Sequence, residues 1–259
     1  MTDIDKNAGR DYDAGKYWKE RFSKGLTIAQ TGHSGFSAGY NGYMYALKRR
    51  SLELAMRRHK IAVKGKSVLD VGCGSGFFLD FYARRGAGHL AGIDITEASV
   101  NAMREKFPSG SFFRMDACGS REPLDGTFDI VNVFDVLYHI IDDGAFGRAI
   151  ANIGAWSDKG SWIFITDSLD PSKSAADHVR YRNPETYSPR LENSGIEIVE
   201  TAGLFNFMGR PLSPGIKNAV LRRLAARAVE SLAWAAYMAD LLYCPPKLAH
   251  MRLMICRKR

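Results

Sequence analysis

Between residues 67 and 203, short runs rich in β-branched and aromatic residues alternate with segments of helical periodicity. This alternation constrains the fold more than any other feature of the chain, because it is typical of a parallel sheet with helices on both faces. The predicted strands cover 67–72, 89–94, 111–116, 128–134, 161–167 and 196–200. We therefore predict an open α/β sheet as the core of the chain.

Three helices are predicted between these strands, at 77–85, 97–107 and 143–156. In the third, Phe146, Ile150 and Ile153 recur at i, i+4 and i+7 and share one face. Asp143 is its expected N-cap. The run MRLMIC at 251–256 predicts one more strand near the end of the chain.

Two segments lie outside this alternation. They divide the chain into an aromatic-rich N-terminal lid at 1–62, a core at 63–210, an insertion at 211–249 and a final strand at 250–259 that completes the core sheet. The lid contains a predicted helix from Asn41 to His59, and the insertion a long one from Ile216 to Tyr243, which Pro245 stops. The insertion helix is basic and amphipathic. It is either a surface helix packed on the body, a wall of an acceptor site or a membrane-surface helix.

The composition further limits the class of protein and the kind of partner. The 259 residues include 46% hydrophobic and 25% charged residues, which are ordinary values for one globular domain. The net charge of +8 favours an anionic partner, such as a phosphorylated carrier, nucleic acid or an acidic membrane surface. The four cysteines have no Cys-x-x-Cys spacing, and we find neither a signal peptide nor a transmembrane stretch, so a cytoplasmic protein with reduced thiols is expected.

The strongest local motif is VLDVGCGSGFF, from Val68 to Phe78. Glycines at Gly72, Gly74 and Gly76 permit a tight turn from strand to helix and let backbone N–H groups approach a ligand. The spacing Gly-x-Gly-x-Gly differs from the Gly-x-Gly-x-x-Gly of dinucleotide sites, so a nicotinamide-dependent oxidoreductase is the weaker match. Asp70, just before the turn, repels a pyrophosphate but suits a ligand with an ammonium and a sulfonium group. The sign of this charge points to S-adenosylmethionine.

Two further carboxylates follow the next two strands. Asp94 ends the second strand, where its two oxygens can accept both hydroxyl groups of a ribose. Asp116 ends the third, where it can accept from an adenine amino group while the backbone N–H of Ala117 reaches a ring nitrogen. Either acid can instead cap a helix. Since the carboxyl ends of parallel strands share one edge of a sheet, Asp70, Asp94 and Asp116 are expected to line one ligand site.

With VLDVGCGSG, GIDIT, RMDA and FDIVNVFDVLYHI, the chain resembles the class I S-adenosylmethionine-dependent methyltransferases, in the branch that acts on small molecules and glycans. The resemblance implies a Rossmann-like seven-stranded sheet with the last strand antiparallel. It also implies that Gly72 and its neighbours hold the methionine part of the cofactor, with Phe134 beside it. Ile95 and Met115 would pack on the adenine.

Methyl transfer needs orientation and a dry site, plus a base where the acceptor is a hydroxyl group. His139, just past the fourth strand, has a suitable pKa range and is the first candidate for that base; packing of a structural histidine is the alternative. Asp135 is the second candidate. Tyr138 and Asp167, at the end of the fifth strand, are further candidates for contact with the acceptor.

Other candidates for contact with cofactor or acceptor lie outside the strand ends. Tyr17, in an aromatic cluster with Trp18, is expected either to close over the cofactor or to pack an N-terminal helix. Arg49 is a candidate partner of the cofactor carboxylate, with a solvated helix face as the alternative. The resemblance also implies that His178, Arg180 and Tyr181, which follow the fifth strand, line the acceptor pocket, with placement on the surface as the alternative.

Two missing motifs narrow the acceptor. No Asn-Pro-Pro-Tyr or Asp-Pro-Pro-Tyr follows the fourth strand, which disfavours methylation of a nucleobase. No Asn follows Asp167, so the metal-dependent catechol pattern is absent and no metal is expected. The predicted function is therefore O-methylation of a small-molecule or sugar-containing acceptor, such as a polysaccharide or natural-product intermediate, which can be anionic. N-methylation of an amine and a basic RNA-binding module are the alternatives, and nothing predicts the oligomeric state.

Overall fold

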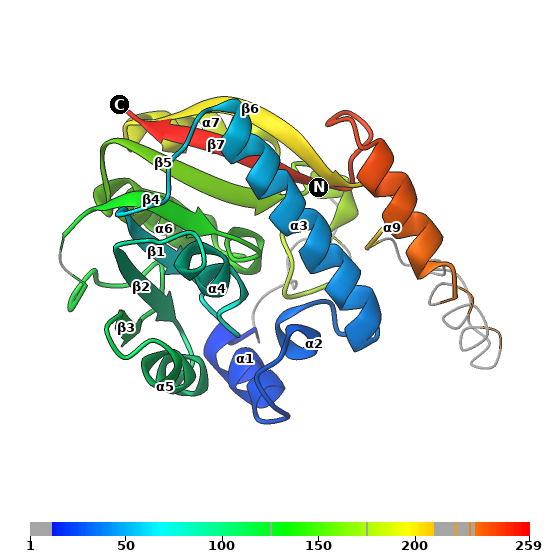
Figure 1. Cartoon of the computed structure of the whole chain (residues 1–259), viewed down its shortest axis with the longest axis horizontal. Coiled ribbons are helices and arrows are strands. Elements are labelled where there is room, and N and C mark those ends of the chain that lie inside the picture. Colours follow the sequence, from blue (N-terminus) through cyan, green and yellow to red (C-terminus); the bar gives the residue numbers. More distant parts are fainter. Residues whose placement is uncertain (1–11, 125, 175, 210–220, 222–227, 229–230) are drawn as a thin grey trace.

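The computed structural model in Figure 1 describes residues 12–124, 126–174, 176–209, 221, 228 and 231–259. Its centre is a seven-stranded sheet in the order β3-β2-β1-β4-β5-β7-β6. The strands are β1 (Ser67–Val71), β2 (His89–Asp94), β3 (Ser111–Arg114), β4 (Phe128–Val133), β5 (Ser157–Asp167), β6 (Ile196–Phe205) and β7 (Met251–Lys258).

The strand order reverses between β1 and β4. From β1 the chain builds outward through β2 to β3, and then crosses back to place β4 on the other side of β1. Strands β1 to β5 pair in parallel, whereas β7 lies antiparallel between β5 and β6. This arrangement confirms the predicted fold, including the antiparallel last strand. The reversal opens a crevice at the carboxyl ends of β1 and β4, where open α/β sheets bind ligands.

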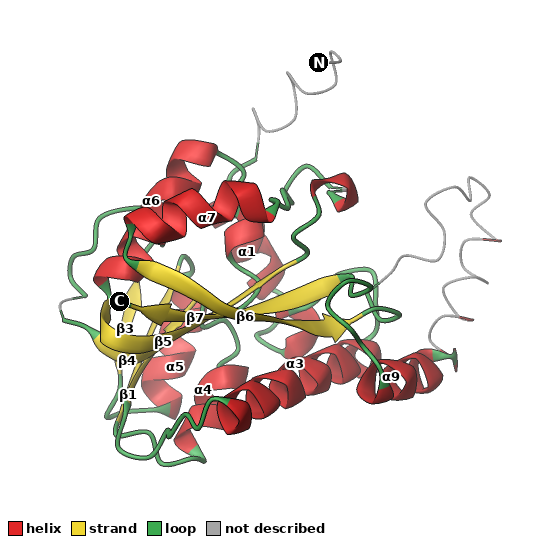
Figure 2. Cartoon of the chain, turned by 90° about the horizontal axis from the view of Figure 1, so that it is seen from above, coloured by secondary structure: helices red, strands yellow, loops and turns green. Residues whose placement is uncertain are grey.

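Helices cover both faces of the sheet (Figure 2). The helices are α1 (Ala14–Phe22), α2 (Ile28–Thr31), α3 (Ala38–Arg58), α4 (Phe77–Ala83), α5 (Glu97–Lys106), α6 (Asp143–Ala155), α7 (Pro184–Asn193) and α9 (Ala233–Leu242), with short 3₁₀ turns at Leu137–His139 and Pro171–Lys173. One face carries α3, α4, α5 and α9, and the other carries α6 and α7. Two apolar layers are thereby buried.

Alternation along the strands supplies these two layers. In β1, Val68 faces the layer beneath α3 and α4, and Leu69 faces the layer beneath α6 and α7. The predicted stripe Phe146, Ile150 and Ile153 on α6 is fully buried in the second layer. Fully burying one such side chain stabilises the fold by about 1.5–3 kcal/mol. The rigid sheet therefore holds the strand ends that form the site.

The sequence placed most elements within a few residues of their observed bounds. One cap was wrong: Asp142, not Asp143, accepts from the Ala145 N–H at 2.7 Å and caps α6. Most of the helix predicted from Ile216 to Tyr243 falls outside the described residues, and α9 is the part that the structure describes. In the described residues, no helix combines the length and hydrophobicity that a membrane span requires.

Candidate active site

The turn from β1 into α4 requires its glycines. Gly72 has a φ of 75°, and a Cβ atom on it would lie 2.4 Å from Cγ2 of Val136. Gly74 has a φ of 48°, and its Cβ would lie 2.9 Å from Cγ2 of Thr31. Because both positions are left-handed and crowded, any side chain would strain the turn or displace its neighbours. The glycines keep the backbone open toward the crevice.

Asp94 ties this turn to the end of β2. Its Oδ2 accepts from the N–H of Gly74 at 2.9 Å, and its Oδ1 accepts from the N–H and hydroxyl of Thr96 at 2.9 and 2.7 Å. Burial raises the pKa of Asp94, although these donors oppose the rise. Each carboxylate oxygen has two lone pairs, so acceptor capacity remains for a ligand.

A cavity at the carboxyl ends of β1, β2, β3 and β4 collects most of the predicted cofactor residues. Those in its wall are Asp70, Gly72, Gly74, Asp94, Ile95, Met115, Asp116, Ala117 and Phe134. Asp116 is exposed, and its Oδ1 accepts from the N–H of Cys118 at 3.0 Å. The structure thus brings together side chains that four separate strand ends contribute.

Asp70 is a buried acid of this cavity, and its pKa is strongly raised. Burial raises the pKa of Asp70 to about 7; the amide of Asn132, which donates to Oδ1 at 2.6 Å, opposes the rise, and the Asp94 charge adds to it. Because this pKa lies near 7, a cationic ligand beside Asp70 would favour the ionised carboxylate and would bind to it more tightly.

Three predicted cofactor residues lie elsewhere. Gly76 has a φ of 74° and precedes α4, where a Cβ would lie 2.5 Å from Sδ of Met103. Arg49 has 53% of its side chain exposed and pairs with Glu53. Tyr17 stacks on His178 with ring centroids 4.6 Å apart. Position therefore supports the alternative role for Arg49, a solvated helix face.

The N-terminal helices α1 and α2 contribute side chains to one part of the cavity wall. Ala14, Trp18 and Phe22 follow at i, i+4 and i+8 on α1, and all three line it together with Thr31 of α2. Their common helical face explains why Trp18 turns inward while its neighbour Tyr17 does not. Trp18 and Phe22 of the aromatic cluster thus line the cavity, whereas Tyr17 packs on His178.

A second cavity adjoins the first and shares Trp18, Thr31, Asp135 and His139 with it. Of the predicted acceptor residues, it contains Tyr138, His178 and Tyr181. Its remaining wall includes Arg21, His33, Met44, Lys48, Lys173, Phe205 and Met251. These three predicted acceptor residues therefore lie in the second cavity, which meets the first cavity at His139 and Asp135.

His139 has a defined tautomer at this junction. Its Nδ1 lies 2.9 Å from the carbonyl oxygen of His178, which can only accept, so Nδ1 carries a proton. In the neutral ring, Nε2 is then an unprotonated acceptor. Burial lowers the pKa of His139 to about 4, against the effect of that hydrogen bond. The ring is therefore neutral at pH 7 and able to accept a proton.

Asp135 is held as a charged group by a residue that sequence analysis missed. It forms an ion pair with Lys48 of α3, whose side chain is only 4% exposed. Burial alone would raise the pKa of Asp135, but Lys48 and the Thr166 hydroxyl outweigh it and hold the pKa below its ordinary value. Its backbone φ is 60°, a strained conformation for a non-glycine residue. A carboxylate so engaged is a poor base.

A helical signal for Lys48 was present in the sequence. Met44 and Leu52, four residues before and after it, are both apolar and buried. A lysine between them on the same helical face predicts a buried ammonium that requires an anionic partner. That partner, Asp135, lies 87 residues away.

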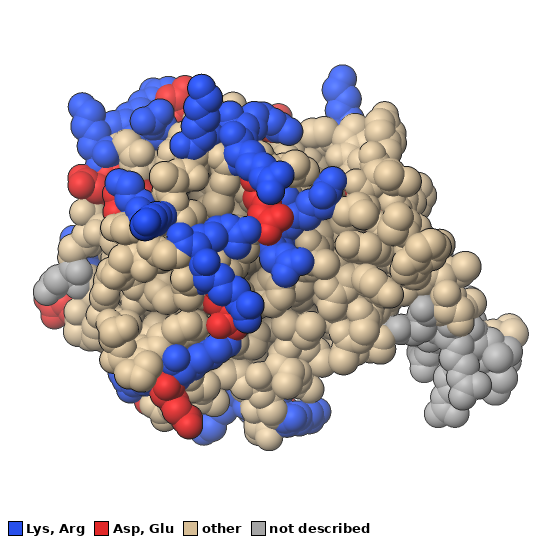
Figure 3. Space-filling view, viewed as in Figure 1, with Lys and Arg blue, Asp and Glu red and all other residues tan. Residues whose placement is uncertain are grey.

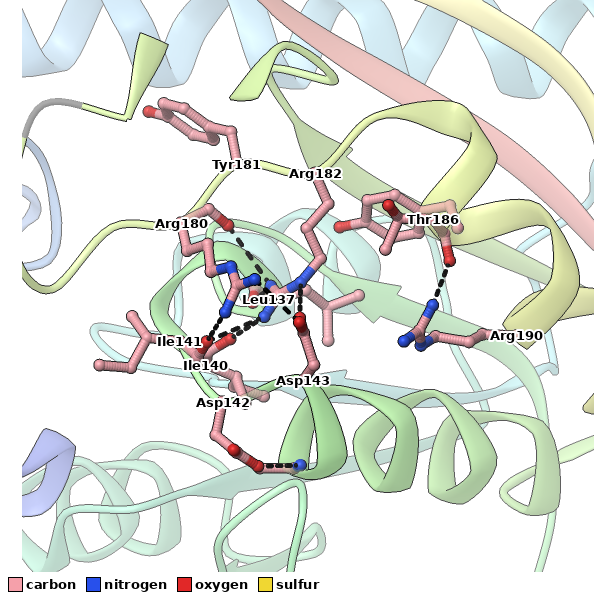
Figure 4. Close-up of polar contacts among 12 residues, drawn as sticks. Leu137, Ile140, Ile141, Asp142, Asp143, Arg180, Tyr181, Arg182, Thr186 and Arg190 are labelled. Atoms are coloured by element: carbon pink, nitrogen blue, oxygen red, sulfur yellow. Dashed lines mark hydrogen bonds and ion pairs between the residues drawn. The ribbon is translucent and has the colours of Figure 1, made fainter. Parts of the chain in front are cut away.

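Two predicted acceptor residues have structural partners instead. Asp167 is fully buried and accepts from the Tyr187 hydroxyl at 2.7 Å. Arg180 donates to the carbonyl of Ile141 at 2.9 Å and pairs with Asp143 at 2.8 Å (Figure 4). Position therefore favours a structural role for both.

A second arginine, Arg182, holds the backbone that follows His139 (Figure 4). Arg182, only 2% exposed, donates to the carbonyl of Ile140 at 2.7 Å and to Oδ1 of Asp143 at 3.0 Å. These bonds hold the carbonyl groups that follow the 3₁₀ turn, where no regular helix could satisfy them. His139 is thereby presented by a rigid segment.

Among the residues that the structure describes, no group of three or more His, Cys, Asp or Glu side chains could hold a metal ion.

The fold and the strand-end carboxylates define a class I methyltransferase. A model of the methyltransferase domain matches residues 40–203, which is more than half of the chain. The chain belongs to this methyltransferase-domain family. The predicted class, an S-adenosylmethionine-dependent methyltransferase, is confirmed.

Individual relatives carry different acceptors in their names. The chain is 26% identical over 166 residues to the ubiquinone biosynthesis O-methyltransferase of Neisseria meningitidis serogroup C (strain 053442), covering 55% of this chain and 68% of the relative. It is 32% identical over 148 residues to phosphoethanolamine N-methyltransferase 1 of Triticum aestivum, covering 52% and 29%. The magnesium protoporphyrin IX methyltransferase of Synechocystis PCC 6803, solved with bound S-adenosylmethionine, shares the fold with a TM-score of 0.59 at 15% identity, over 97% of this chain and 100% of that one.

Proposed function

We propose that the protein transfers a methyl group from S-adenosylmethionine to an oxygen atom of a small-molecule or sugar-containing acceptor. The observation that carries this proposal is the neutral His139 at the junction of the two cavities, with Nε2 free to accept a proton. A base is needed for a hydroxyl acceptor, whereas an amine can bind in its neutral form. The likeness to an O-methyltransferase supports the same choice.

The first cavity has the donor set for the cofactor. The carboxylates of Asp70 and Asp94 suit its cationic and hydroxyl groups, and Ile95 and Met115 supply apolar surface for its adenine. When bound, S-adenosylmethionine supplies an electrophilic methyl group, and its positive charge is lost as that methyl leaves. Trp18 and Phe22 exclude water from this side of the site.

Proton transfer to His139 is compatible with its low pKa. The burial that lowers this pKa also disfavours a second positive charge in the site. A proton that Nε2 accepts during the reaction replaces a positive charge and does not add one. The nearby Asp135 carboxylate, kept ionised by Lys48, further favours the protonated ring. We assign the role of base to His139 and a positioning role to Asp135.

Asp94→Ala is expected to weaken S-adenosylmethionine binding by about 2–3 kcal/mol, or roughly a hundredfold, because two charge-assisted hydrogen bonds to the ribose are lost. Calorimetric titration measures the change. Thr96→Ala is the matched control: it removes the hydroxyl that donates to Asp94 but keeps the carboxylate. Full affinity in a folded Asp94→Ala protein would remove the ribose assignment.

Cofactor affinity is expected to fall as the pH is lowered through about 7. The pKa of Asp70 is about 7 in the free protein, and a cationic ligand lowers it, so binding releases a proton from the protonated fraction. Between pH 7 and pH 6 the affinity should fall about fivefold. Titration in buffers of different ionisation enthalpy detects the released proton. The dependence should vanish in Asp70→Asn, and its persistence there would assign it to another group.

The choice between oxygen and nitrogen can be tested with paired acceptors. Each pair consists of a hydroxyl compound and its amine counterpart, incubated with the protein and methyl-labelled cofactor. We expect label in the hydroxyl members, with mass spectrometry locating the methyl on oxygen. Label confined to the amines would instead establish the N-methyltransferase alternative, which the likeness to a phosphoethanolamine N-methyltransferase keeps in consideration.

The RNA-binding alternative has less support. Figure 3 shows Lys and Arg side chains over one face of the molecule, interspersed with Asp and Glu, while the side near α9 is largely uncharged. Several surface cations of the chain are already paired, as Arg85 is with Glu53 and Lys106 with Asp80. A continuous cationic groove, which nucleic acid would require, does not follow from this distribution. We further propose that the protein is cytoplasmic and that it can contact a membrane surface peripherally.

A further inference from the structure

The second cavity holds a cation, Arg21, that forms no ion pair with the acids among the described residues. Arg21 of α1 lines this cavity and donates to the carbonyl of Gly32 at 2.8 Å and to the hydroxyl of Tyr17 at 3.1 Å. It also donates to the carbonyl of Ala29 at 3.4 Å and lies over the rings of Tyr17 and Trp18. All of these partners are uncharged. A part-buried guanidinium without a carboxylate partner is costly unless a ligand supplies the charge.

Two histidines in the same wall present N–H groups. Nδ1 of His33 accepts from the N–H of Gly35 at 3.0 Å, so the neutral ring carries its proton on Nε2. The Tyr17 hydroxyl accepts from Arg21 and lies 3.2 Å from Nε2 of His178. When this hydroxyl donates its proton to Nε2, the neutral His178 ring carries its own proton on Nδ1. In that tautomer, His33, His178 and Arg21 are all donors.

The charges around these groups leave the cavity positive. Desolvation and then the Arg21 charge lower the pKa of His33 and of His178. The carboxylate of Asp135 is engaged by Lys48. Asp177, which precedes His178, is exposed and only partly offsets Arg21. Lys173 also lines the cavity, but it pairs with Asp170 at 3.3 Å.

The rest of the wall is mainly apolar and aromatic. It includes Trp18, Met44, Tyr138, Val179, Tyr181, Phe205 and Met251. Such a wall suits a ring or another compact apolar body. His139 connects this surface to the cofactor cavity.

We propose that the methyl acceptor is an apolar, hydroxyl-bearing compound with a carboxylate or phosphate group, which Arg21, His33 and His178 bind while the hydroxyl lies toward His139. The inference rests on the proposed function, since it names the acceptor of the same site. Arg21 supplies charge and a fork of donors, and the two histidines supply further hydrogen bonds. The anion would thereby orient the acceptor.

The test compares anionic and neutral probes that share a 4-hydroxyphenyl ring. The protein, saturated with S-adenosylhomocysteine, is titrated with 4-hydroxybenzoate, 4-hydroxyphenyl phosphate and the neutral 4-hydroxybenzamide. We expect at least one anion to bind tenfold or more tightly than the amide. Comparison of the two anions identifies the preferred group. Equal affinity for the amide, or no measurable binding of either anion at millimolar concentration, would overturn the proposal.

Variants locate the anion. Arg21→Gln is expected to remove the preference for the anion, and His33→Gln to reduce it severalfold. The matched control is Arg190→Gln, because Arg190 is also part-buried, donates to a backbone carbonyl and lies over an aromatic ring, that of Phe146, yet it lines neither of the two cavities (Figure 4). Arg190→Gln should keep the preference. An unchanged preference in a folded Arg21→Gln protein, shown by its melting curve, contradicts the assignment.

Two more readouts separate the alternatives. In NMR titrations, the pKa of His178 should rise when the anion binds, whereas the signals of His59, which pairs with Glu200 outside the cavity, should not move on addition of the anion. If Arg21→Gln instead weakens S-adenosylhomocysteine binding by a comparable factor, Arg21 belongs to the cofactor carboxylate and the proposal fails. Neither probe binding nor the histidine shift requires methyl transfer, so failure of this proposal is distinguishable from failure of the proposed function.

Discussion

His139→Ala and His139→Gln are expected to lower the single-turnover rate of methyl transfer by about 10²–10⁴, because a hydroxyl acceptor then has no positioned base. Affinity for S-adenosylmethionine should change little, since the first cavity keeps its carboxylates and glycines. Gln is the sharper substitution. It retains polarity and most of the volume but cannot accept a proton at neutral pH.

His59→Gln is the matched control for this experiment. His59 ends α3, pairs with Glu200 and lies away from the junction of the two cavities, so its substitution should leave the rate unchanged. Melting temperatures of all variants separate loss of a base from loss of packing. Near-normal transfer by both His139 variants would leave His139 with a structural role and make orientation alone the source of catalysis.

Lys48→Met is expected to lower the free energy of unfolding by about 3–5 kcal/mol at pH 7, since it leaves the Asp135 carboxylate partly buried without its cation. The loss should shrink as the pH falls. In the parent protein the lowered pKa of Asp135 contributes stability that is lost as the pH falls through that pKa. In the variant, burial raises the pKa, so protonation relieves the unpaired charge. Chemical denaturation at several pH values measures both effects.

The double variant Lys48→Met with Asp135→Asn provides the control. Removing both charges should restore much of the lost stability, and the interaction energy from the double-mutant cycle should exceed about 1 kcal/mol. Losses that simply add in the double variant would show that the two side chains act independently. The same double variant tests positioning: with Asp135 neutral, the pKa of His139 should fall further, because the Asp135 charge raises it.

The cofactor half of the site was largely predictable from local sequence. A glycine turn after β1 and an acid at the end of each of β1 and β2 are features of short segments, and parallel strands bring their carboxyl ends to one edge. Asp70, Asp94 and Asp116 therefore line one cavity, as the pattern predicted. Arg49 lies outside this cavity, because its side chain on α3 is exposed and pairs with Glu53.

What the sequence by itself determined was the sheet, its helical layers and the strand ends that form the first cavity, because periodicity and glycine spacing act within a few residues. Only the tertiary structure decided which charges are paired and which histidine nitrogens carry protons. Lys48 meets Asp135 across 87 residues, and Tyr17 meets His178 across 161. Proton positions and pKa values depend on such distant contacts, because burial and neighbouring charges set them and neither is a local property of the chain.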